Sequence, residues 1–562
     1  SGGRAAGEVF ERDYARHTGR VRELFDKFFG KMFAETEQDS PVVDLILNPE
    51  PTDAEIEGAL RYYGFKNYAS AYENLRLLAE GSASSPHASR TRNFFCSIAP
   101  ILLQHLEQSP DPDMALNNLQ RCIAALGAPS TFYEILSSNT KAIQPLVALS
   151  SYSDHLIRLL VNDPGVIDFL LSSRVLEEES SRANIDKALG KFLAINPNFY
   201  ESIQRFKNGE LLRIGLRDVL ELAEIAEVTR ELSSVAEVIL DRVYGECLEA
   251  HISRYGRPLE TSGSQSVMSI LGMGKLGGSE INYASDLDVI FIYSGEGQTT
   301  GGTSDPVSCQ QFFASLAGRM IRKMTELNPY GYLYKMDARL RPDGEQGLLA
   351  ISADSFREYH RGKSALWEKR AMTKMRPVAG DMKLGEQLHR FAHQLIYSPN
   401  FFSADVIEDA LVMLRKIIGT VQAKDHEGME IKNAEGGIIE IEFLIQLLQL
   451  RHGAGVEALR TTNTLEALDV LAKRKHISRK ARDDVEATFV LLRKVENRLR
   501  LMHDRSLSEL PSDRSALDKL ALRLGTTAAD RSPGEVLMDM LASYIHRSHR
   551  VFDEQMKEFG RG

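Results

Sequence analysis

The segment GMGKLGGSEINYASDLDVIFIY, residues 272–293, constrains the fold more than any other part of the chain. It sets a group of glycines between two short runs of β-branched and apolar residues, the pattern of β-strands. The glycines also match the GxGxxG pattern of dinucleotide-binding turns. Such a turn opens a crossover helix, and the whole connection takes at least about 10 to 12 residues. Only eight residues separate Gly278 from Leu287, so we expect two neighbouring strands joined by a short turn and a helical stub.

Two acidic residues stand at the start of the second strand. Asp286 and Asp288 are two positions apart, so their side chains point to the same side of an extended segment. Two carboxylates this close repel each other, which raises the pKa of one of them unless a cation compensates. Mg²⁺ relieves this repulsion, because it prefers carboxylate oxygens and takes further ligands from nucleotide phosphates. The turn of Gly277 and Gly278 lets backbone N–H groups approach those phosphates, because no Cβ intervenes.

A third carboxylate follows in the sequence YLYKMDARLRP, residues 332–342. Its alternation predicts a strand as far as Pro342 that carries on one face Leu333, Lys335, Asp337, Arg339 and Arg341. If this strand lies beside the first, Asp337 completes a metal cluster and the arginines meet triphosphate charge, which guanidinium groups match bidentately. An isolated pair of acids is more often structural or solvated. Three carboxylates from two strands, next to a glycine turn, predict a two-metal site for phosphoryl transfer.

The rest of the chain is almost entirely helical in pattern. Apolar residues recur at helical spacing in residues 231–243 and 485–502, and residues 305–327 also have the pattern of an amphipathic helix. The sequence therefore predicts a mainly α protein with an inserted α/β core, flanked by helical bundles. We expect four regions: an N-terminal helical region at 1–108, a helical domain at 109–260, the core at 261–381 and a C-terminal helical bundle at 382–562.

Composition and charge restrict the class of protein. The formal net charge is -10, so the chain lacks the basic field that attracts polynucleotides, and we expect no nucleic-acid partner. No run approaches the roughly 18 apolar residues of a membrane span, and we expect no membrane partner. The four cysteines lack the spacing of a disulfide framework or a zinc site, which favours a cytoplasmic location. The first residues, SGGRAAGE, are typical of a tag remnant or of an internal start within a longer chain.

Three further features have structural as well as functional interpretations. Arg370 and Lys374 are four positions apart and share a helical face, which fits a solvated basic stripe as well as nucleotide contact. Glu440 and Glu442 follow two glycines at an expected helix start, where the helix dipole favours acids in any case. We expect the single tryptophan, Trp367, to be a packing residue.

Several long motifs resemble a known family. The segment 272–293, together with DARLRPDGEQGLL, WEKRAMTKMRPVAGD and EGGIIEIEFLIQLLQLRHG, is similar to segments of the glutamine synthetase adenylyltransferase family. The resemblance covers most of the chain and implies a catalytic core of the DNA polymerase β-like nucleotidyltransferase type. Family members typically carry two such units, one that attaches AMP to a tyrosine of glutamine synthetase and one that removes it by phosphorolysis. This chain has one set of motifs and resembles a single unit.

The resemblance also implies site residues, a cofactor and partners. The family's metal-binding carboxylates correspond to Asp286, Asp288 and Asp337. Its phosphate-binding turn corresponds to Gly277, Gly278 and Ser279. Further candidates for phosphate contact are Lys275, Arg339 and Arg341. The family implies Mg²⁺ as cofactor, ATP as substrate, glutamine synthetase as protein substrate, and the PII signal protein and glutamine as regulators.

The direction of the reaction stays open. Residues 14–29 resemble residues 544–559 in type, which favours the second, adenylylating unit of a longer protein. However, GGIIEIEF and LLRKVENRLRLMHDRSLSELP are at least as similar to the deadenylylating unit. Our first expectation is adenylyl transfer from MgATP to a tyrosine of glutamine synthetase, and phosphorolytic removal is the alternative. A regulatory module that holds nucleotide without catalysis does not need three carboxylates, and a template-free RNA polymerase is disfavoured by the net charge.

Overall fold

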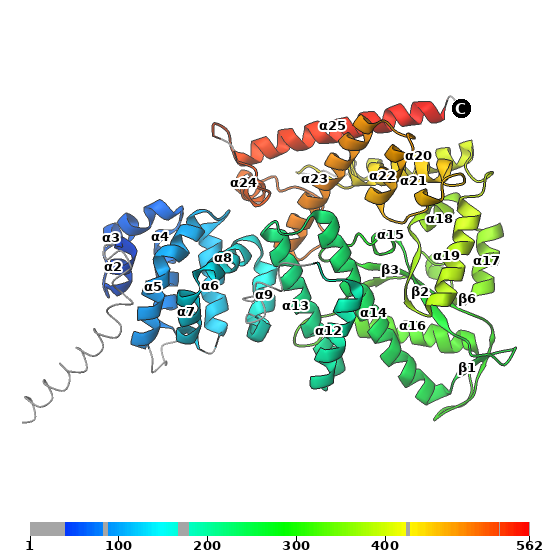
Figure 1. Ribbon diagram of the computed structural model, residues 1–562, viewed down its shortest axis with the longest axis horizontal. Helices are drawn as coiled ribbons and strands as arrows, with labels where there is room; N and C mark the ends of the chain where they lie inside the picture. Colours follow the sequence, from blue (N-terminus) through cyan, green and yellow to red (C-terminus); the bar gives the residue numbers. More distant parts are fainter. Residues whose placement is uncertain are drawn as a thin grey trace, which may run out of the picture. The chain divides into compact units, whose positions relative to one another are not determined.

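The computed structural model describes residues 40–81, 88–126, 128–166, 179–422, 428–527 and 529–560. By its internal contacts the chain divides into two compact units, Ser1–Ser151 and Tyr152–Gly562 (Figure 1). The similarity between residues 14–29 and 544–559 cannot be followed in space, because residues 14–29 lie outside the described residues. The four regions expected from the sequence stay a prediction.

The first unit is helical throughout its described part. Its α-helices are α2 (Pro41–Leu47), α3 (Asp53–Leu60), α4 (Tyr68–Glu80), α5 (Ala88–Glu107), α6 (Pro112–Ala125), α7 (Pro129–Ser138) and α8 (Ile143–Tyr152). Local sequence signals start several of them. Thr52 and Glu55 form a capping box before α3, and Asp111 caps α6, which has a proline at its first position. Helices α4, α5, α6 and α7 pack on one another around buried leucines and Phe95.

Four α-helices precede the sheet in the described part of the second unit. They are α9 (Asp154–Asn162), α12 (Arg182–Ile195), α13 (Phe199–Val219) and α14 (Ile225–Tyr255). The helix predicted for residues 231–243 lies inside α14, so that prediction is confirmed. Helices α13 and α14 are held together by buried charges, because Arg213 and Arg217 both pair with the fully buried Glu231.

The strands of the described chain all lie between Pro258 and Gly380. They are β1 (Pro258–Glu260), β2 (Met268–Gly272), β3 (Leu287–Tyr293), β4 (Gly297–Thr299), β5 (Met336–Asp337), β6 (Ala350–Ser352) and β7 (Arg376–Gly380). Strands β1 and β4 form a separate pair, and the main sheet has the order β5-β3-β2-β7, with β6 also pairing with β3. Strand β2 runs antiparallel to β3 and β7, whereas β5 and β6 run parallel to β3. The predicted neighbouring strands are confirmed, with α15 (Gly274–Gly277) as the helical stub between them.

Both faces of the main sheet are buried. On one face, Tyr293 stacks on Phe313 of α16 (Cys309–Thr325), with ring centroids 5.1 Å apart. On the other face, Ile290 and Ile292 belong to a hydrophobic core that continues into the C-terminal helices. This double coverage explains why β3 is a nearly continuous apolar run rather than an alternating one.

The C-terminal helices close this core. They are α17 (Ala353–Gly362), α18 (Leu366–Ala371), α19 (Met382–Ile396), α20 (Ala404–Gln422), α21 (Ile438–His452), α22 (Thr464–Lys473), α23 (Arg479–His503), α24 (Arg514–Arg523) and α25 (Pro533–Phe559). In Figure 1, α25 runs along α23 and α24, as their contacts also show. The protein is therefore mainly α with a small mixed sheet, as predicted. No helix in the described part of the chain is long and apolar enough to cross a membrane, and all four cysteines are free thiols.

The strand predicted for residues 332–342 is wrong except at Met336 and Asp337. Strand β5 contains only Met336 and Asp337, and the chain then turns. The guanidinium of Arg341 donates hydrogen bonds to the carbonyl oxygens of Ala338, Glu345 and Gly347. These bonds satisfy backbone carbonyls inside the loop. The segment after Asp337 therefore forms a turn, although its residues alternate as they would in a strand.

Candidate functional site

The three predicted metal-binding acids lie on, or directly before, two adjacent parallel strands. Asp288 of β3 lies opposite Asp337 of β5 in the strand register. Asp286 and Lys335 each stand two residues earlier on their segments, and the N–H of Leu287 donates to the Lys335 carbonyl at 2.9 Å. Residues in register on adjacent strands point to the same side of a sheet. Asp286, Asp288 and Asp337 therefore form an acidic patch at the start of β3, with Lys335 beside it.

The carboxylates of this acidic patch differ in their electrostatic environment. Burial and the nearby charges of Asp337 and Asp286 raise the pKa of Asp288 to about 6. Hydrogen bonds from Arg339 lower the pKa of Asp337, and the two side chains form an ion pair at 2.6 Å. Asp286 is exposed. Burial is the larger cause of the raised pKa of Asp288, and the repulsion that the sequence predicted for neighbouring acids adds to it.

The acidic patch fits a magnesium ion that a ligand helps to hold. Across the described residues, no three His, Cys, Asp or Glu side chains gather closely enough to hold a metal ion by themselves, and Asp337 is turned toward Arg339. Mg²⁺ is usually bound by one or two carboxylates together with waters and substrate phosphates. Asp286 and Asp288 supply such oxygen donors, and a cation would remove the repulsion at Asp288.

Close packing accounts for the glycine turn. A Cβ on Gly277 would lie 1.6 Å from the carbonyl oxygen of Lys374, so only glycine fits there. Gly274 has a φ of +51°, and a Cβ would come within 2.9 Å of Asp288 Oδ2. A Cβ on Gly278 would lie 3.1 Å from the Lys374 ammonium. The turn is thereby pressed against Asp288 on one side and Lys374 on the other.

Ser279 follows the turn and has a protein partner. Its backbone has a φ of +56°, and its hydroxyl accepts a hydrogen bond from Arg376 at 2.7 Å. Arg376 also donates to the carbonyl oxygen of Gly277 at 2.8 Å. Arg376, which the sequence did not single out, therefore fixes the shape of the predicted phosphate-binding turn.

Lys275 lies in a buried ion cluster. Its ammonium donates to Glu496 of α23 at 2.9 Å, and Glu496 also accepts from Arg493 at 3.1 Å and Arg500 at 2.7 Å. Asn282 donates to the same carboxylate. Burial alone would raise the pKa of Glu496, but these cations hold it well below its ordinary value. We call Glu496, Lys275, Asn282, Arg493 and Arg500 the Glu496 cluster.

The Glu496 cluster changes the interpretation of Lys275. Burial lowers the pKa of Lys275, and its ion pair with Glu496 opposes that shift. Its charge is thus already compensated inside the protein. Sequence patterns gave no signal for this, because Lys275 and Glu496 are 221 residues apart in the chain.

Arg370 and Lys374 are buried in protein contacts. Arg370 donates to Gln446 Oε1 at 2.6 Å and lies over the ring of Phe443, 3.7 Å from its centroid. Lys374 pairs with Glu280 at 2.5 Å. Both interpretations of the basic stripe, solvation and nucleotide contact, are therefore replaced by a structural role.

The remaining singled-out residues also have structural surroundings. Glu440 is buried in the first turn of α21, where it accepts from the N–H of Gly436 at 2.8 Å and from His549 at 2.9 Å. Trp367 lines a small internal cavity with Phe356 and His360. This position agrees with the packing role expected for Trp367.

A cavity of about 720 Å³ adjoins the acidic patch. Its volume falls in the range of roughly 300 to 1,000 Å³ that is typical of small-molecule sites. Asp286 forms part of its wall, together with residues of α9 and α13, the segment 327–335 and the end of α23. Five basic side chains face two aspartates in this wall: Arg158, Lys207, Lys335, Arg500 and Arg505 against Asp286 and Asp504. In a chain of net charge -10, this cavity suits an anionic ligand.

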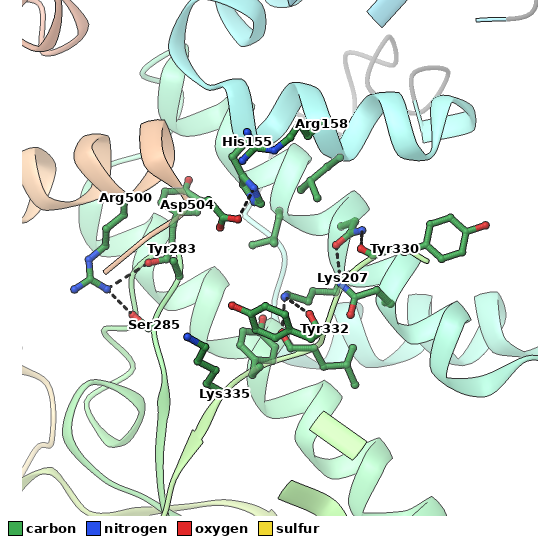
Figure 2. Close-up of a pocket in the computed structure, with 18 of the residues that line it drawn as sticks. His155, Arg158, Lys207, Tyr283, Ser285, Tyr330, Tyr332, Lys335, Arg500 and Asp504 are labelled. Atoms are coloured by element: carbon green, nitrogen blue, oxygen red, sulfur yellow. Dashed lines mark hydrogen bonds and ion pairs between the residues drawn. The ribbon is translucent and has the colours of Figure 1, made fainter. Parts of the chain in front are cut away.

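Hydrogen bonds from α13 fix one wall of the cavity. Lys207 donates to the carbonyl oxygens of Tyr332 at 3.2 Å and Leu333 at 2.5 Å, and Asn208 donates to the Tyr330 carbonyl at 3.1 Å. Burial lowers the pKa of Lys207 to about 8. These bonds hold the segment 328–333 in place (Figure 2).

The opposite wall is formed by α9 and the end of α23. His155 pairs with Asp504 at 3.0 Å, and Arg500 donates to the Tyr283 carbonyl at 3.4 Å and to Ser285 Oγ at 3.3 Å (Figure 2). Sequence reasoning missed this cavity, because its walls come from helices that are far apart in the chain and carry no shared motif.

The fold and the site together define a class, namely a mainly helical protein in which a small mixed sheet presents an acidic patch beside a cationic cavity. Residues 143–391 match the family model described as glutamate-ammonia ligase adenylyltransferase. This match contains the whole main sheet and the acidic patch. Residues 143–391 therefore form a domain of the glutamate-ammonia ligase adenylyltransferase family. Residues 412–556 match the family model described as GlnD PII-uridylyltransferase.

The chain is also similar to proteins named bifunctional glutamine synthetase adenylyltransferase/adenylyl-removing enzyme. The one from Thioalkalivibrio sulfidiphilus is 29% identical over 459 residues, which cover 78% of this chain and 47% of that protein. The one from Shewanella loihica is 29% identical over 435 residues, 76% of this chain and 44% of that protein. The one from Nitrosococcus oceani is 35% identical over 325 residues, 58% of this chain and 33% of that protein. The chain thus spans less than half the length of these relatives.

Proposed function

We propose that this chain is a nucleotidyltransferase unit that transfers AMP from MgATP to a tyrosine of glutamine synthetase. The observation that carries the proposal is the pairing of Asp288 with Asp337 in register, with Asp286 in the wall of a cationic cavity large enough for a nucleotide. The names of the relatives support the choice of protein substrate. We propose a cytoplasmic location because the four cysteines are free thiols. The mixed sheet and its acidic patch support a core of the DNA polymerase β-like type.

The reaction is an in-line displacement at the α-phosphorus. The tyrosine oxygen forms a bond to the α-phosphorus, and the bond from that phosphorus to the bridging oxygen of the β-phosphate breaks. Pyrophosphate leaves with the electron pair, and the hydroxyl proton passes to solvent. Asp286 and Asp288 would hold Mg²⁺, which neutralises phosphate charge and polarises the phosphoryl group. Much of the rate would come from positioning and charge neutralisation in a preorganised site.

The protein's own groups prepare this site. The packed glycine turn brings backbone to within van der Waals reach of Asp288, and the Arg376 bonds keep that turn rigid. Arg339 keeps Asp337 ionised. Arg341 is engaged with loop carbonyls, so its contribution would be to hold the loop that carries Arg339.

The second candidate is the reverse chemistry, the removal of AMP, which the name of the relatives also includes. An oxygen of inorganic phosphate would form the bond to the α-phosphorus of adenylylated tyrosine, the bond to the tyrosine oxygen would break, and ADP would form. The same three carboxylates would serve. The direction is decided by incubating the chain with unmodified glutamine synthetase and labelled ATP, and with adenylylated glutamine synthetase and phosphate.

The regulators are proposed on separate grounds. The match of residues 412–556 to the PII-uridylyltransferase family supports the PII signal protein as a partner of the C-terminal helices. Glutamine as a regulator follows from the family resemblance.

The test of the site uses Asp286→Asn and Asp288→Asn. Each removes one carboxylate charge, so we expect transfer of labelled AMP in the active direction to fall by at least about 100-fold, with unchanged circular dichroism. Asp305→Asn, at an exposed aspartate away from the acidic patch, serves as the matched control and should keep full activity. Near wild-type transfer by either patch variant would show that the site lies elsewhere.

A further inference from the structure

Lys335 is a cavity cation beside the acidic patch, and its own sequence position did not mark it as a site residue. It precedes Asp337 by two positions, and its carbonyl is bonded to the N–H of Leu287, so it stands level with Asp286 on the adjacent segment. Both Lys335 and Asp286 line the cavity. Figure 2 shows the Lys335 side chain extending into the cavity space, between the Tyr332 side and the Arg500 side.

Three of the other cations in the cavity wall are already engaged. Arg500 pairs with the fully buried Glu496, and Lys207 donates to two backbone carbonyls. Arg158, on α9, pairs with Asp154. Within the described chain, no carboxylate lies within ion-pair distance of the Lys335 ammonium. An exposed lysine next to three carboxylates that forms no ion pair with them is free to meet an incoming anion.

We propose that Lys335 binds the β- and γ-phosphates of the nucleotide and so sets the direction in which the phosphate chain enters the cavity. This inference rests on the proposed function. The α-phosphorus must lie at the acidic patch, since transfer occurs there, and the phosphates beyond it extend toward Lys335, the cavity cation that stands level with Asp286. When the bond from the α-phosphorus to the bridging oxygen breaks, the electron pair stays on pyrophosphate, and the Lys335 ammonium offsets this added charge. In phosphorolysis, the same ammonium would bind the inorganic phosphate that attacks.

This geometry predicts which ligands depend on Lys335. ATP, ADP and pyrophosphate carry a phosphate group that reaches past the acidic patch, whereas AMP carries only the α-phosphate. A contact limited to the β- and γ-phosphates therefore raises the affinity for ATP, ADP and pyrophosphate but not the affinity for AMP. A lysine that merely supports the fold would affect all four ligands alike.

The experiment measures binding by isothermal titration calorimetry in magnesium buffer, with the full chain and with Lys335→Gln. We expect the dissociation constants for ATP and pyrophosphate to rise roughly 10- to 100-fold, the effect of losing a hydrogen bond to a charged group. The constant for AMP should change less than about twofold. Lys335→Arg, which keeps the charge, should recover most of the ATP affinity. Lys383→Gln, at an exposed lysine of α19 away from the cavity, is the matched control and should bind like the wild type.

The outcomes separate this inference from the proposed function. Equal loss of AMP and ATP binding in Lys335→Gln, or no loss for either, would overturn the role of Lys335. If the discrimination is observed but no AMP is exchanged with glutamine synthetase in either direction, the role of Lys335 stands and the proposed protein substrate is wrong. If AMP transfer is observed and Lys335→Gln leaves the KM for ATP unchanged, the proposed function stands and Lys335 is not a phosphate ligand.

Discussion

Acidification should destabilise the second unit through His360, which is buried with an uncharged ring. This histidine of α17 is 3% exposed, and no described residue hydrogen-bonds either ring nitrogen. Burial, and to a lesser extent the charge of Lys369, lowers its pKa from 6.5 to about 3. Between these two values the unfolded chain binds a proton that the folded chain excludes. The stabilisation is therefore fully present above pH 6.5 and is lost as the pH falls below it.

The size of the effect follows from these two pKa values. Below pH 6.5 each pH unit costs about 1.4 kcal/mol for one histidine. Between pH 7 and pH 5 the unfolded state gains a proton almost completely while folded His360 stays neutral, so the contribution is about 2 kcal/mol. His360→Gln removes the titrating group, and its free energy of unfolding should fall by about 2 kcal/mol less over the same interval.

The assay is urea unfolding at several pH values, followed by tryptophan fluorescence. The chain has a single tryptophan, and Trp367 lines the same small cavity as His360, so the signal reports on this part of the second unit. The comparison of the two proteins cancels the contributions of all other titrating groups. Equal pH dependence of wild type and His360→Gln would show that folded His360 takes up a proton in this range, which would refute the reasoning.

Two further predictions concern packing at the glycine turn and a buried charge pair. Gly277→Ala places a Cβ against the Lys374 carbonyl and should lower the free energy of unfolding by at least about 3 kcal/mol. Gly419→Ala, in an open position of α20, should raise it by up to about 1 kcal/mol. Thermal melts compare the two variants, and an equal effect on both would contradict the packing argument. Glu440→Gln should lower the pKa of His549, because burial opposes but the hydrogen bond from His549 to Glu440 raises that pKa above 6.5. NMR titration measures the shift, and in the wild type this pair's stabilisation should be lost as the pH rises through the folded pKa of His549. An unchanged His549 pKa in Glu440→Gln would show that another group raises it.

The sequence predicted correctly the helices and strands that are marked by a local pattern of apolar residues. Helices α14, α16 and α23 lie where apolar residues recur at helical spacing, and strands β2 and β3 lie where β-branched runs flank the glycines. Such segments bury one face or both faces in any fold of this class, so their sequence alone carries the signal.

The sequence failed where a distant partner decides the role of a charge. Lys275 was a candidate for phosphate contact, and its partner Glu496 lies on α23. Arg493 and Arg500 of the same helix are also buried around that carboxylate. Helical periodicity records which residues are polar, and it does not record whether a polar residue meets water or a charge of opposite sign.

The position of the acidic patch could be predicted from the spacing of the aspartates, whereas the side-chain contacts of Asp337 could not. The prediction that Asp337 lies beside Asp288 follows from two strands in one sheet, and the register supports it. The ion pair between Asp337 and Arg339 depends on the turn after β5, and the strand pattern concealed that turn. The cationic cavity required three helices from different parts of the chain and had no sequence signature.

The Glu496 cluster has a consequence for how this molecule can be divided. A fragment that ended after the last strand would retain Lys275 and Asn282 but lack the carboxylate that both of them contact. In such a fragment the Lys275 ammonium, next to the glycine turn, would lack its counter-charge. The smallest fragment that keeps the sheet together with these contacts must therefore extend through α23, which ends more than a hundred residues after the last strand.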